Sequence, residues 1–269
     1  MNRSHYIKDL RERFLSGLGA PETLEFKTDE FQREAIDAIV NGEDTLVVAP
    51  TGAGKTHIAI EAITAALYLR QKSVYTTPLK ALSNTKYADL KARFEPQFKV
   101  GLLTGDRKID TDADVVVATT EIYRNELYQA EGGRFSVIVL DEVHFLADSQ
   151  RGPVWEESII LSPKESTLLM LSASISNAEE IASWITSVRG KKCRIVTKAH
   201  RPVELRLGFL HPELGPLPLV GQKGRVLPEV TQFYGNLGLD SGQRRLKVRG
   251  SDRPWRKANR GGGGRRGRR

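Results

Sequence analysis

Two glycines, a lysine and a threonine lie close together in the stretch APTGAGKT, which occupies residues 49–56. The apolar run TLVVA leads into this stretch, and a segment with helical periodicity follows it. Gly52 and Gly54 let the backbone curl, so that its N–H groups and the positive end of the following helix face an anion. Lys55 is placed to bridge the β- and γ-phosphates of a nucleotide, and the Thr56 hydroxyl is placed to ligate Mg²⁺. A chance glycine-rich turn is the alternative, and the position of GKT after a strand argues against it.

Two acids, Asp141 and Glu142, follow an apolar run in the stretch VIVLDEVHFLAD. In an open α/β sheet, the carboxyl ends of the strands form the edge at which ligands bind. Asp141 is expected to hold Mg²⁺ through its waters, and Glu142 to orient and deprotonate the water that attacks the γ-phosphorus. A solvated turn is the alternative for such a pair. The phosphate-binding loop earlier in the chain favours a hydrolytic site, with Thr56 and Asp141 as the residues that hold the metal.

Seven apolar, β-rich runs supply the framework that must position these residues. They are TLVVA (45–49), SVYTT (73–77), KVGLL (99–103), DVVVAT (114–119), FSVIVL (135–140), TLLMLS (167–172) and CRIVT (193–197). Helical periodicity over 55–70, 79–93, 119–129 and 177–186 separates most of these runs. Strands that alternate with helices imply a parallel sheet covered on both faces. We therefore predict an α/β fold with a doubly wound parallel sheet over residues 25–207, and we expect Trp155 and Trp184 in its core.

The regions on either side of residues 25–207 lack this alternation. Residues 1–24 have an amphipathic helical pattern without a continuous apolar block, which predicts a helical extension and neither a signal peptide nor a membrane anchor. Residues 208–240 are rich in Pro and Gly and predict an extended or partly ordered linker. Residues 241–269 form a low-complexity basic tail that ends in RGGGGRRGRR, and we expect this tail to be disordered.

The charge of the chain is concentrated in that tail. The net charge is +8, but residues 241–269 carry twelve Lys and Arg against the single acid Asp252, which leaves −3 on the rest of the chain. The high net charge therefore gives no evidence of a basic face on the folded domain, and nucleic-acid binding must be argued from motifs. The single cysteine, Cys193, excludes an intrachain disulfide and suits a reducing compartment, so we expect a cytoplasmic setting.

The stretch DEVH, residues 141–144, resembles motif II of the DExH-box helicases of superfamily 2, and APTGAGKT resembles their motif I. Further matches fall in the order of that family over residues 25–205. PLKALSNTKY and DEVHFLADSQRGPVWEE are most similar to the superkiller-type DExH RNA helicases, the group that feeds RNA to degradation machines. The resemblance implies a RecA-like domain that uses ATP and Mg²⁺.

The resemblance also implies roles for individual residues around the nucleotide. Phe31 is expected to pack on the adenine base, and Gln32 to hydrogen-bond its edge. The phosphate loop comprises Pro50, Thr51, Gly52, Ala53, Gly54, Lys55 and Thr56. The residues implied in catalysis are Lys55, Asp141, Glu142 and His144, of which His144 is expected to link the ATP site to motif III. That motif is Ser172, Ala173 and Ser174 here, and the resemblance implies that it couples the ATP site to strand binding.

Contacts with single-stranded nucleic acid are a further implication of the resemblance. The residues concerned are Thr77, Pro78, Lys80, Thr104, Gly105, Thr119, Thr120 and Arg124. Small polar side chains and backbone N–H groups at loop ends can contact phosphates without reading sequence. Taken one at a time, Thr77, Lys80, Thr104 and Thr120 are explained equally well as helix caps or loop residues. The motifs favour RNA as the strand and leave DNA open.

A motor of superfamily 2 has two RecA-like domains, and nothing after residue 207 resembles the second. We therefore expect the first motor domain, which binds Mg-ATP, hydrolyses it slowly and unwinds nothing alone. One alternative is a nucleotide-gated RNA-binding or adaptor module that acts through the tail at 241–269. Another is the first domain of a DNA helicase or translocase. The Arg/Gly tail is explained equally well as a loose RNA-binding element and as a flexible interdomain segment.

Overall fold

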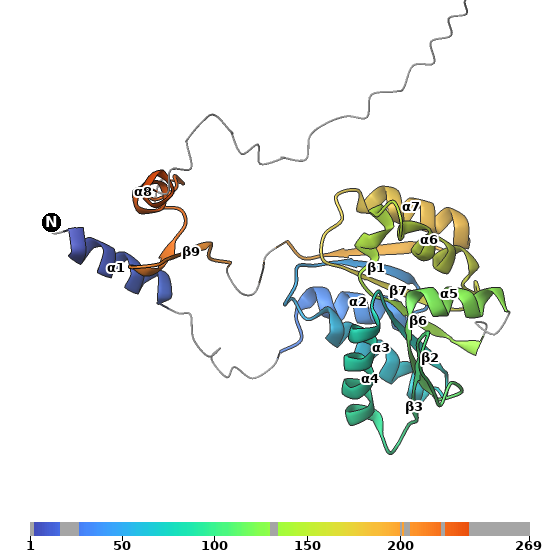
Figure 1. Ribbon diagram of the computed structural model, residues 1–269. Helices are drawn as coiled ribbons and strands as arrows, with labels where there is room; N and C mark the ends of the chain where they lie inside the picture. The colour runs from blue at the N-terminus through green and yellow to red at the C-terminus, as the bar shows by residue number, and fades with distance from the viewer. Residues whose placement is uncertain are drawn as a thin grey trace, which may run out of the picture. The chain divides into compact units, whose positions relative to one another are not determined.

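A computed structural model of the chain describes residues 3–16, 27–129, 134–199, 201, 205–221 and 224–236. The chain divides into two compact units, of which the larger is Glu22–Glu204 and the smaller joins Met1–Pro21 to Leu205–Arg269. Strands and helices alternate through the larger unit (Figure 1). Its strands are β1 (Asp44–Val48), β2 (Ser73–Thr77), β3 (Val100–Leu103), β4 (Lys108–Ile109), β5 (Val115–Thr119), β6 (Val137–Leu140), β7 (Thr167–Ser172) and β8 (Cys193–Thr197). Its helices are α2 (Glu30–Val40), α3 (Lys55–Tyr68), α4 (Lys80–Phe94), α5 (Thr120–Tyr128), the 3₁₀ helix η2 (Val143–Ala147), α6 (Gly152–Leu161) and α7 (Ala178–Arg189).

The strands of the larger unit form one sheet in the order β4-β3-β5-β2-β6-β7-β1-β8. All neighbouring strands are parallel except β4, which runs antiparallel to β3 at the edge of the sheet. The seven strands that the apolar runs predict are all present, which confirms the α/β class and the doubly wound parallel sheet. The two-residue strand β4 was not predicted, because so short a segment has no apolar run of its own.

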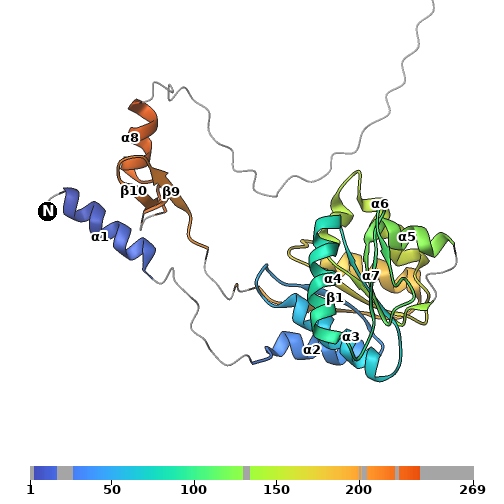
Figure 2. The same ribbon diagram turned by 60° about the horizontal axis from the view of Figure 1, so that its bottom comes forward.

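Helices cover both faces of this sheet (Figures 1 and 2), with α2, α3 and α4 on one face and α5, α6 and α7 on the other. Side chains that alternate along each strand point to opposite faces. Val47 of β1 therefore packs with Ile58 of α3, whereas its neighbour Leu46 belongs to the cluster that contains Ile159 of α6. Trp155 lies in the second cluster with 2% of its surface exposed, as predicted.

A buried ion pair joins the start of β1 to the end of α7. Arg189 Nε lies 2.5 Å from Asp44 Oδ2, and the backbone N–H of Leu168 donates to Asp44 Oδ1 at 2.8 Å. Both charged side chains are almost completely shielded from solvent. The rest of the guanidinium donates to the backbone carbonyls of Ser162, Pro163 and Ser166. The contact closes the sheet at the end opposite to the predicted ligand edge.

The smaller unit contains α1 (Arg3–Leu15), the antiparallel hairpin of β9 (Gly208–His211) and β10 (Gly215–Pro218), and α8 (Pro228–Asn236). Figure 2 shows the hairpin and both helices of this unit. Its core is formed by Ile7, Leu217, Leu227 and Val230. Helix α1 lies within residues 1–24, for which we predicted a helical extension, and its Ile7 contributes to this core.

The hairpin and α8 differ from the extended or partly ordered linker that we predicted over 208–240. Two prolines lie in β10, at Pro216 and Pro218, and a two-stranded hairpin tolerates them because every strand in it is an edge. Part of the core comes from α1, some 200 residues earlier in the chain, and no local pattern reveals such a partner. The predicted basic tail lies outside the described residues. No helix among the described residues is long and apolar enough to cross a membrane.

Candidate nucleotide site

The predicted phosphate loop connects β1 to α3. Gly52 and Gly54 have φ angles of +85° and +84°, in the left-handed region that glycine adopts without strain. The backbone N–H of Ala53 donates to the carbonyl of Pro50 at 3.2 Å, which closes the turn. Helix α3 begins at Lys55, so its unpaired N-terminal N–H groups lie next to the loop. This arrangement can hold a phosphate group.

Gln32 fastens this loop to helix α2. The side chain is 3% exposed, and its Nε2 donates to the carbonyls of Ala53 at 3.1 Å and Gly54 at 3.3 Å. Its Oε1 accepts from the backbone N–H of Asp29 at 2.9 Å. Both Nε2 donors and one of the two Oε1 lone pairs are therefore engaged, so a contact with adenine would use the remaining lone pair or require one of these bonds to be exchanged. That contact stays a prediction.

Phe31, the other residue predicted at the base, is 7% exposed and belongs to the core beside α3. Lys198 Nζ lies over its ring, 4.9 Å from the centroid, and forms an ion pair with Asp29. Lys198 follows β8 and was absent from the predicted site. It covers the ring that was expected to receive the base.

We expect Gly54→Ala to damage the loop by a contact as well as by backbone strain. A Cβ at residue 54 would lie 2.4 Å from Gln32 Nε2, whereas a Cβ at Gly190, with a φ of +73°, would meet nothing within 4 Å. Left-handed strain costs roughly 1–2 kcal/mol at either position, and Gly54→Ala also displaces the Gln32 amide. Urea unfolding and nucleotide titration of both variants check this. Equal losses of stability, with unchanged nucleotide affinity, would contradict it.

Lys55 lies within the phosphate loop and points back at it. Its Nζ donates to the carbonyl of Ala49 at 2.7 Å and approaches that of Pro50 at 3.3 Å. Burial lowers the pKa of the ammonium, while the carboxylates of Glu142 and Asp141 act in the opposite direction. The Lys55 ammonium therefore interacts electrostatically with the carboxylates of Glu142 and Asp141, the two acids predicted at this site.

Asp141 follows β6, and hydrogen bonds to its carboxylate and to its backbone carbonyl hold it in place. Tyr75 Oη donates to its Oδ2 at 2.7 Å, and the backbone N–H of Glu142 donates to its Oδ1 at 2.9 Å. Trp155 Nε1 donates to its backbone carbonyl at 3.3 Å. Burial and the neighbouring Asp141 carboxylate raise the pKa of the Tyr75 phenol well above its ordinary value, so the phenol remains a donor.

Glu142 has a φ of +56°, a left-handed conformation that non-glycine residues adopt at a cost. Its Oε2 lies 3.2 Å from His144 Nδ1 and finds no hydrogen-bond partner among the described residues. His144 stacks on Phe145, and Phe145 stacks on Trp155, with ring centroids 4.8 Å and 5.3 Å apart. These rings support the short helix η2 that carries His144. A carboxylate oriented in this way can accept a proton from a water.

Motif III lies beside the phosphate loop because β7 is a neighbour of β1. The backbone N–H of Ala49 donates to the carbonyl of Ser172 at 3.0 Å. Ser172 is fully buried, and its Oγ finds no hydrogen-bond partner among the described residues. Ala173 is half-buried and Ser174 is exposed. The described contacts thus join motif III to the phosphate loop, and its coupling role stays a prediction.

The residues predicted to contact single-stranded nucleic acid come from loops that follow three neighbouring β-strands, in the order β3-β5-β2. They lie along one half of the carboxyl edge, whereas the nucleotide loops follow β6, β7 and β1 in the other half. The set comprises Thr77, Pro78 and Lys80 at the end of β2, Thr104 and Gly105 after β3, and Thr119, Thr120 and Arg124 around the start of α5.

The four threonines of this set are buried, with exposed fractions between 1% and 6%. Thr77 Oγ1 lies 2.7 Å from Ser83 Oγ, and Thr120 Oγ1 donates to the carbonyl of Thr77 at 3.2 Å. Thr104 Oγ1 donates to Asp106 Oδ1 at 2.9 Å. The Thr120 hydroxyl thus joins the start of α5 to the end of β2, and those of Thr77 and Thr104 bond within their own segments, as the structural alternative expects. Phosphate contacts at these positions would have to come from backbone groups.

Lys80 and Arg124 bring positive charge to the same half of the edge, and each has an acidic partner. Lys80 Nζ lies 3.3 Å from Asp106 Oδ1, and Arg124 Nη1 lies 2.9 Å from Glu157 Oε2. Hydrogen bonds from Thr104 and then Lys80 lower the pKa of Asp106, and the bond from Arg124 lowers that of Glu157. Both carboxylates therefore compete with a phosphate for these cations.

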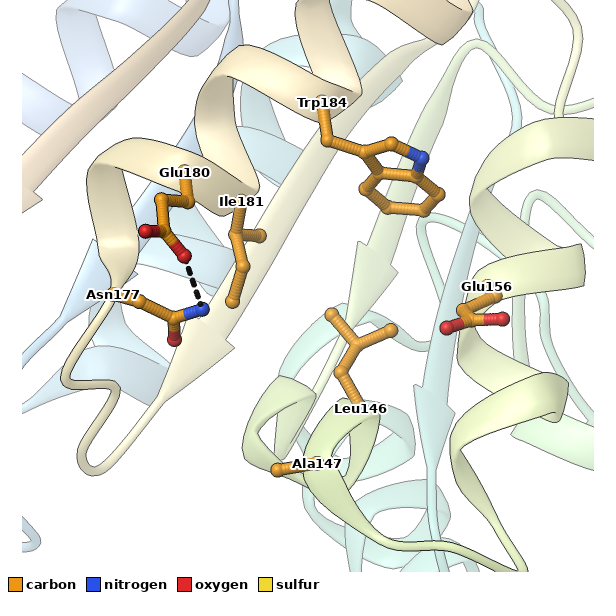
Figure 3. A pocket seen from close by; sticks show the side chains of 7 residues that line it. All are labelled: Leu146, Ala147, Glu156, Asn177, Glu180, Ile181 and Trp184. Carbon is orange, nitrogen blue, oxygen red and sulfur yellow. Dashed lines mark hydrogen bonds between the residues drawn. The ribbon is translucent and has the colours of Figure 1, made fainter. Parts of the chain in front are cut away.

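A cavity of about 350 Å³ lies between η2, α6 and α7 (Figure 3). Figure 3 shows Trp184, Ile181 and Leu146 around the same space, with Asn177 hydrogen-bonded to Glu180 at 3.2 Å. Trp184 is half-buried there, which places it at the margin of the core rather than inside it. The residues described around this cavity include none of the predicted site residues. Its lining is Leu146, Ala147, Glu156, Asn177, Glu180, Ile181 and Trp184.

The donor set at the loop fits a magnesium ion bound together with a nucleotide. Thr56 and Asp141 present oxygen atoms, which Mg²⁺ prefers, and this ion usually takes only one or two protein ligands beside phosphates and waters. Among the described residues, no group of three His, Cys, Asp or Glu side chains could hold a metal by itself. Lys86 Nζ donates to Thr56 Oγ1 at 3.1 Å, so the positively charged ammonium of a side chain already contacts this oxygen.

Sequence reasoning missed Tyr75, Lys86 and Lys198. Tyr75 and Lys86 lie within stretches whose pattern predicted an ordinary strand and an ordinary helix. The available signal was the place of Lys86 within the matched stretch PLKALSNTKY and of Tyr75 shortly before it. The order of the strands was needed to bring them to the nucleotide loops.

Parts of the chain are similar to proteins of known family. The family model described as DEAD/DEAH box helicase matches residues 29–181. The chloroplastic DExH-box ATP-dependent RNA helicase DExH15 of Arabidopsis thaliana is 47% identical over 208 residues, which are 74% of this chain and 18% of that protein. The probable helicase HelY of Mycobacterium leprae is 50% identical over 184 residues, 68% of this chain and 20% of that protein. The exosome RNA helicase MTR4 of Mus musculus is 43% identical over 183 residues, 67% and 17% of the two chains.

The chain therefore spans about a fifth of the length of these relatives. A similar solved structure is that of the DUF1998 helicase MrfA bound to DNA, with a TM-score of 0.55 and 19% identity over 74% of this chain and 30% of that one. This likeness supports the fold alone. The match of more than half of the chain to the family model, together with the motifs at the ends of β1 and β6, shows that the chain belongs to the DEAD/DEAH box helicase family.

Proposed function

We propose that this chain is the ATP-binding motor domain of a DExH-box RNA helicase, and that it binds Mg-ATP and single-stranded RNA. The observation that carries the proposal is that the phosphate loop with Lys55 follows β1 and that Asp141 and Glu142 follow β6, at the same carboxyl edge of one sheet. The relatives named as RNA helicases support the choice of RNA over DNA. A cytoplasmic setting stays a prediction from the single cysteine.

The residues of the site divide the work of ATP hydrolysis. The N–H groups of the loop and the Lys55 ammonium bind the phosphates, and Thr56 and Asp141 would hold the metal. When bound, Mg²⁺ neutralises charge that develops on the phosphates. Glu142 orients the attacking water and takes its proton, and His144 Nδ1 lies 3.2 Å from the Glu142 carboxylate.

Single-stranded RNA would lie along the other half of the carboxyl edge, where β2, β3 and β5 end. Lys80 and Arg124 supply the charge there, and backbone groups around Pro78 and Gly105 supply contacts that do not depend on base identity. Each cation must first leave its acidic partner, Asp106 or Glu157. We therefore expect weak binding that weakens further as salt rises.

Binding of a fluorescent ATP analogue, followed by steady-state hydrolysis with and without single-stranded RNA, tests the proposal on the full chain. We expect Mg²⁺-dependent binding and slow turnover, because the arginine residues of a second motor domain contribute on the order of 10³-fold or more in rate in comparable enzymes. A chain that binds no nucleotide would refute the proposal. Robust unwinding at low salt would refute the assignment of a single motor domain.

The described residues give no specific support to the adaptor alternative, and a deletion separates it from the proposal. Removal of residues 241–269 is expected to reduce RNA affinity in part and to leave ATP binding unchanged. The residual RNA affinity should fall further in Lys80→Ala, because that residue lies on the edge and not in the tail. Complete loss of RNA binding by the deletion alone would favour the adaptor module.

A further inference from the structure

Two side chains of β2 and α4 reach the nucleotide site from the half of the sheet that ends in the strand-binding loops. Tyr75 of β2 is fully buried, and its Oη donates to Asp141 Oδ2 at 2.7 Å. Lys86 of α4 donates from Nζ to Thr56 Oγ1 at 3.1 Å and lies 5.7 Å from the centroid of the Tyr75 ring. Each residue proposed to hold the metal is therefore itself held by a side chain from β2 or α4.

The Tyr75 hydroxyl fixes the orientation of the Asp141 carboxylate. Its bond to Oδ2 complements the bond that the backbone N–H of Glu142 makes to Oδ1 at 2.9 Å. A carboxylate with both oxygens bonded has little freedom to rotate. Hydrogen bonds of this kind to a metal-binding residue typically change metal affinity by about 10- to 100-fold.

Lys86 acts on the same site in the opposite direction. A threonine hydroxyl has two acceptor lone pairs, and the Lys86 ammonium occupies one of them on Thr56. A divalent metal on the same oxygen would lie within a few ångströms of this positive charge and would be repelled by it. Lys86 therefore opposes binding of the metal, and binding is favoured when Lys86 moves away.

We propose that Tyr75 and Lys86 set the metal affinity of the nucleotide site in opposite directions, Tyr75 by fixing Asp141 and Lys86 by competing for Thr56. This rests on the proposed function, and both are positioning residues rather than catalytic ones. Helix α4 also carries Lys80 at its first position. Exchange of Lys86 for the metal thus links loading of the nucleotide site to the helix that begins at the strand-binding edge.

Titration of a fluorescent ATP analogue against the full chain tests the pair, at several Mg²⁺ concentrations and in EDTA. The measured quantity is the gain in affinity that the metal provides. Tyr75→Phe is expected to reduce this gain about tenfold and to leave the affinity in EDTA within about twofold of wild type. Lys86→Met is expected to increase the gain about threefold or more. Lys86→Arg keeps the charge and should remain close to wild type.

A second tyrosine–lysine pair on α4 provides matched controls. Lys91 Nζ lies 3.3 Å from Tyr87 Oη and 5.5 Å from the centroid of that ring, outside the nucleotide site. Tyr87→Phe and Lys91→Met repeat the same deletions and should leave the gain unchanged. Tyr123→Phe removes a buried hydroxyl that lies 2.9 Å from Ser162 Oγ, and it controls for a general loss of stability.

Opposite shifts in Tyr75→Phe and Lys86→Met, with unmoved controls, support the proposal. Shifts in the same direction, a shift in only one of the two variants, or equal changes with and without the metal overturn it. Failure of the wild-type chain to bind nucleotide under any condition would instead overturn the proposed function and the pair with it. If the wild-type chain binds nucleotide and both variants show the wild-type gain in affinity with Mg²⁺, only the proposal for Tyr75 and Lys86 is overturned.

Discussion

Glu142→Gln is expected to slow ATP hydrolysis by roughly 10²- to 10⁴-fold while nucleotide affinity changes little, because an amide cannot take a proton from the attacking water. The substitution keeps size and shape, and Glu142 Oε2 has no hydrogen bond among the described residues that the change would break. Single-turnover assays with excess protein resolve the slow basal rate, and analogue titration gives the affinity.

Two further variants define the limits of that experiment. Lys55→Ala should show the converse behaviour, with nucleotide binding lost, because the loop then has no cation for the β- and γ-phosphates. Glu156→Gln removes an exposed carboxylate from α6 next to the motif II region and should hydrolyse ATP at the wild-type rate. Unchanged turnover in Glu142→Gln would show that another group acts as the base.

Arg189→Met is expected to lower the free energy of unfolding of the larger unit by about 3–5 kcal/mol. It leaves the buried Asp44 carboxylate without its main partner and deprives the carbonyls of Ser162, Pro163 and Ser166 of a donor. Methionine fills much of the same volume, so the loss arises from unpaired polar groups. Urea unfolding followed by tryptophan fluorescence measures it.

The neighbouring pair of Arg194 and Glu43 provides the comparison. Arg194 Nε lies 2.8 Å from Glu43 Oε2, but the two side chains are 36% and 31% exposed. Water and salt screen such a pair, and Arg194→Met should leave the unfolding midpoint nearly unchanged. If Arg189→Met costs no more than Arg194→Met, the buried pair does not stabilise the sheet as inferred here.

The strands and the phosphate loop were predictable because their signals are local. A buried parallel strand is a short apolar run, and APTGAGKT contains within eight residues every group that the loop needs. Asp141 and Glu142 were predictable for the same reason, since they directly follow such a run. Family membership, expected from these motifs, is confirmed by the match over residues 29–181.

Contacts between distant segments were not predictable in this way. Tyr75 looks like an ordinary buried strand residue, and its bond to Asp141 depends on β2 lying next to β6. Asp44 and Arg189 are 145 residues apart, and the core of the smaller unit includes Ile7 of α1. The threonines predicted to contact nucleic acid matched a motif by type and order, but their burial is seen only in the folded structure.

The place of β1 in the sheet has a consequence for synthesis of the chain. Its neighbours are β7 and β8, so Asp44–Val48 has no partner strand until residues 167–197 have been made. Contacts of such long sequence separation slow folding, and an apolar strand with two open edges invites aggregation meanwhile. We therefore expect the nucleotide loop at the end of β1 to become competent only after most of the larger unit has left the ribosome, although the loop lies in the first part of that unit.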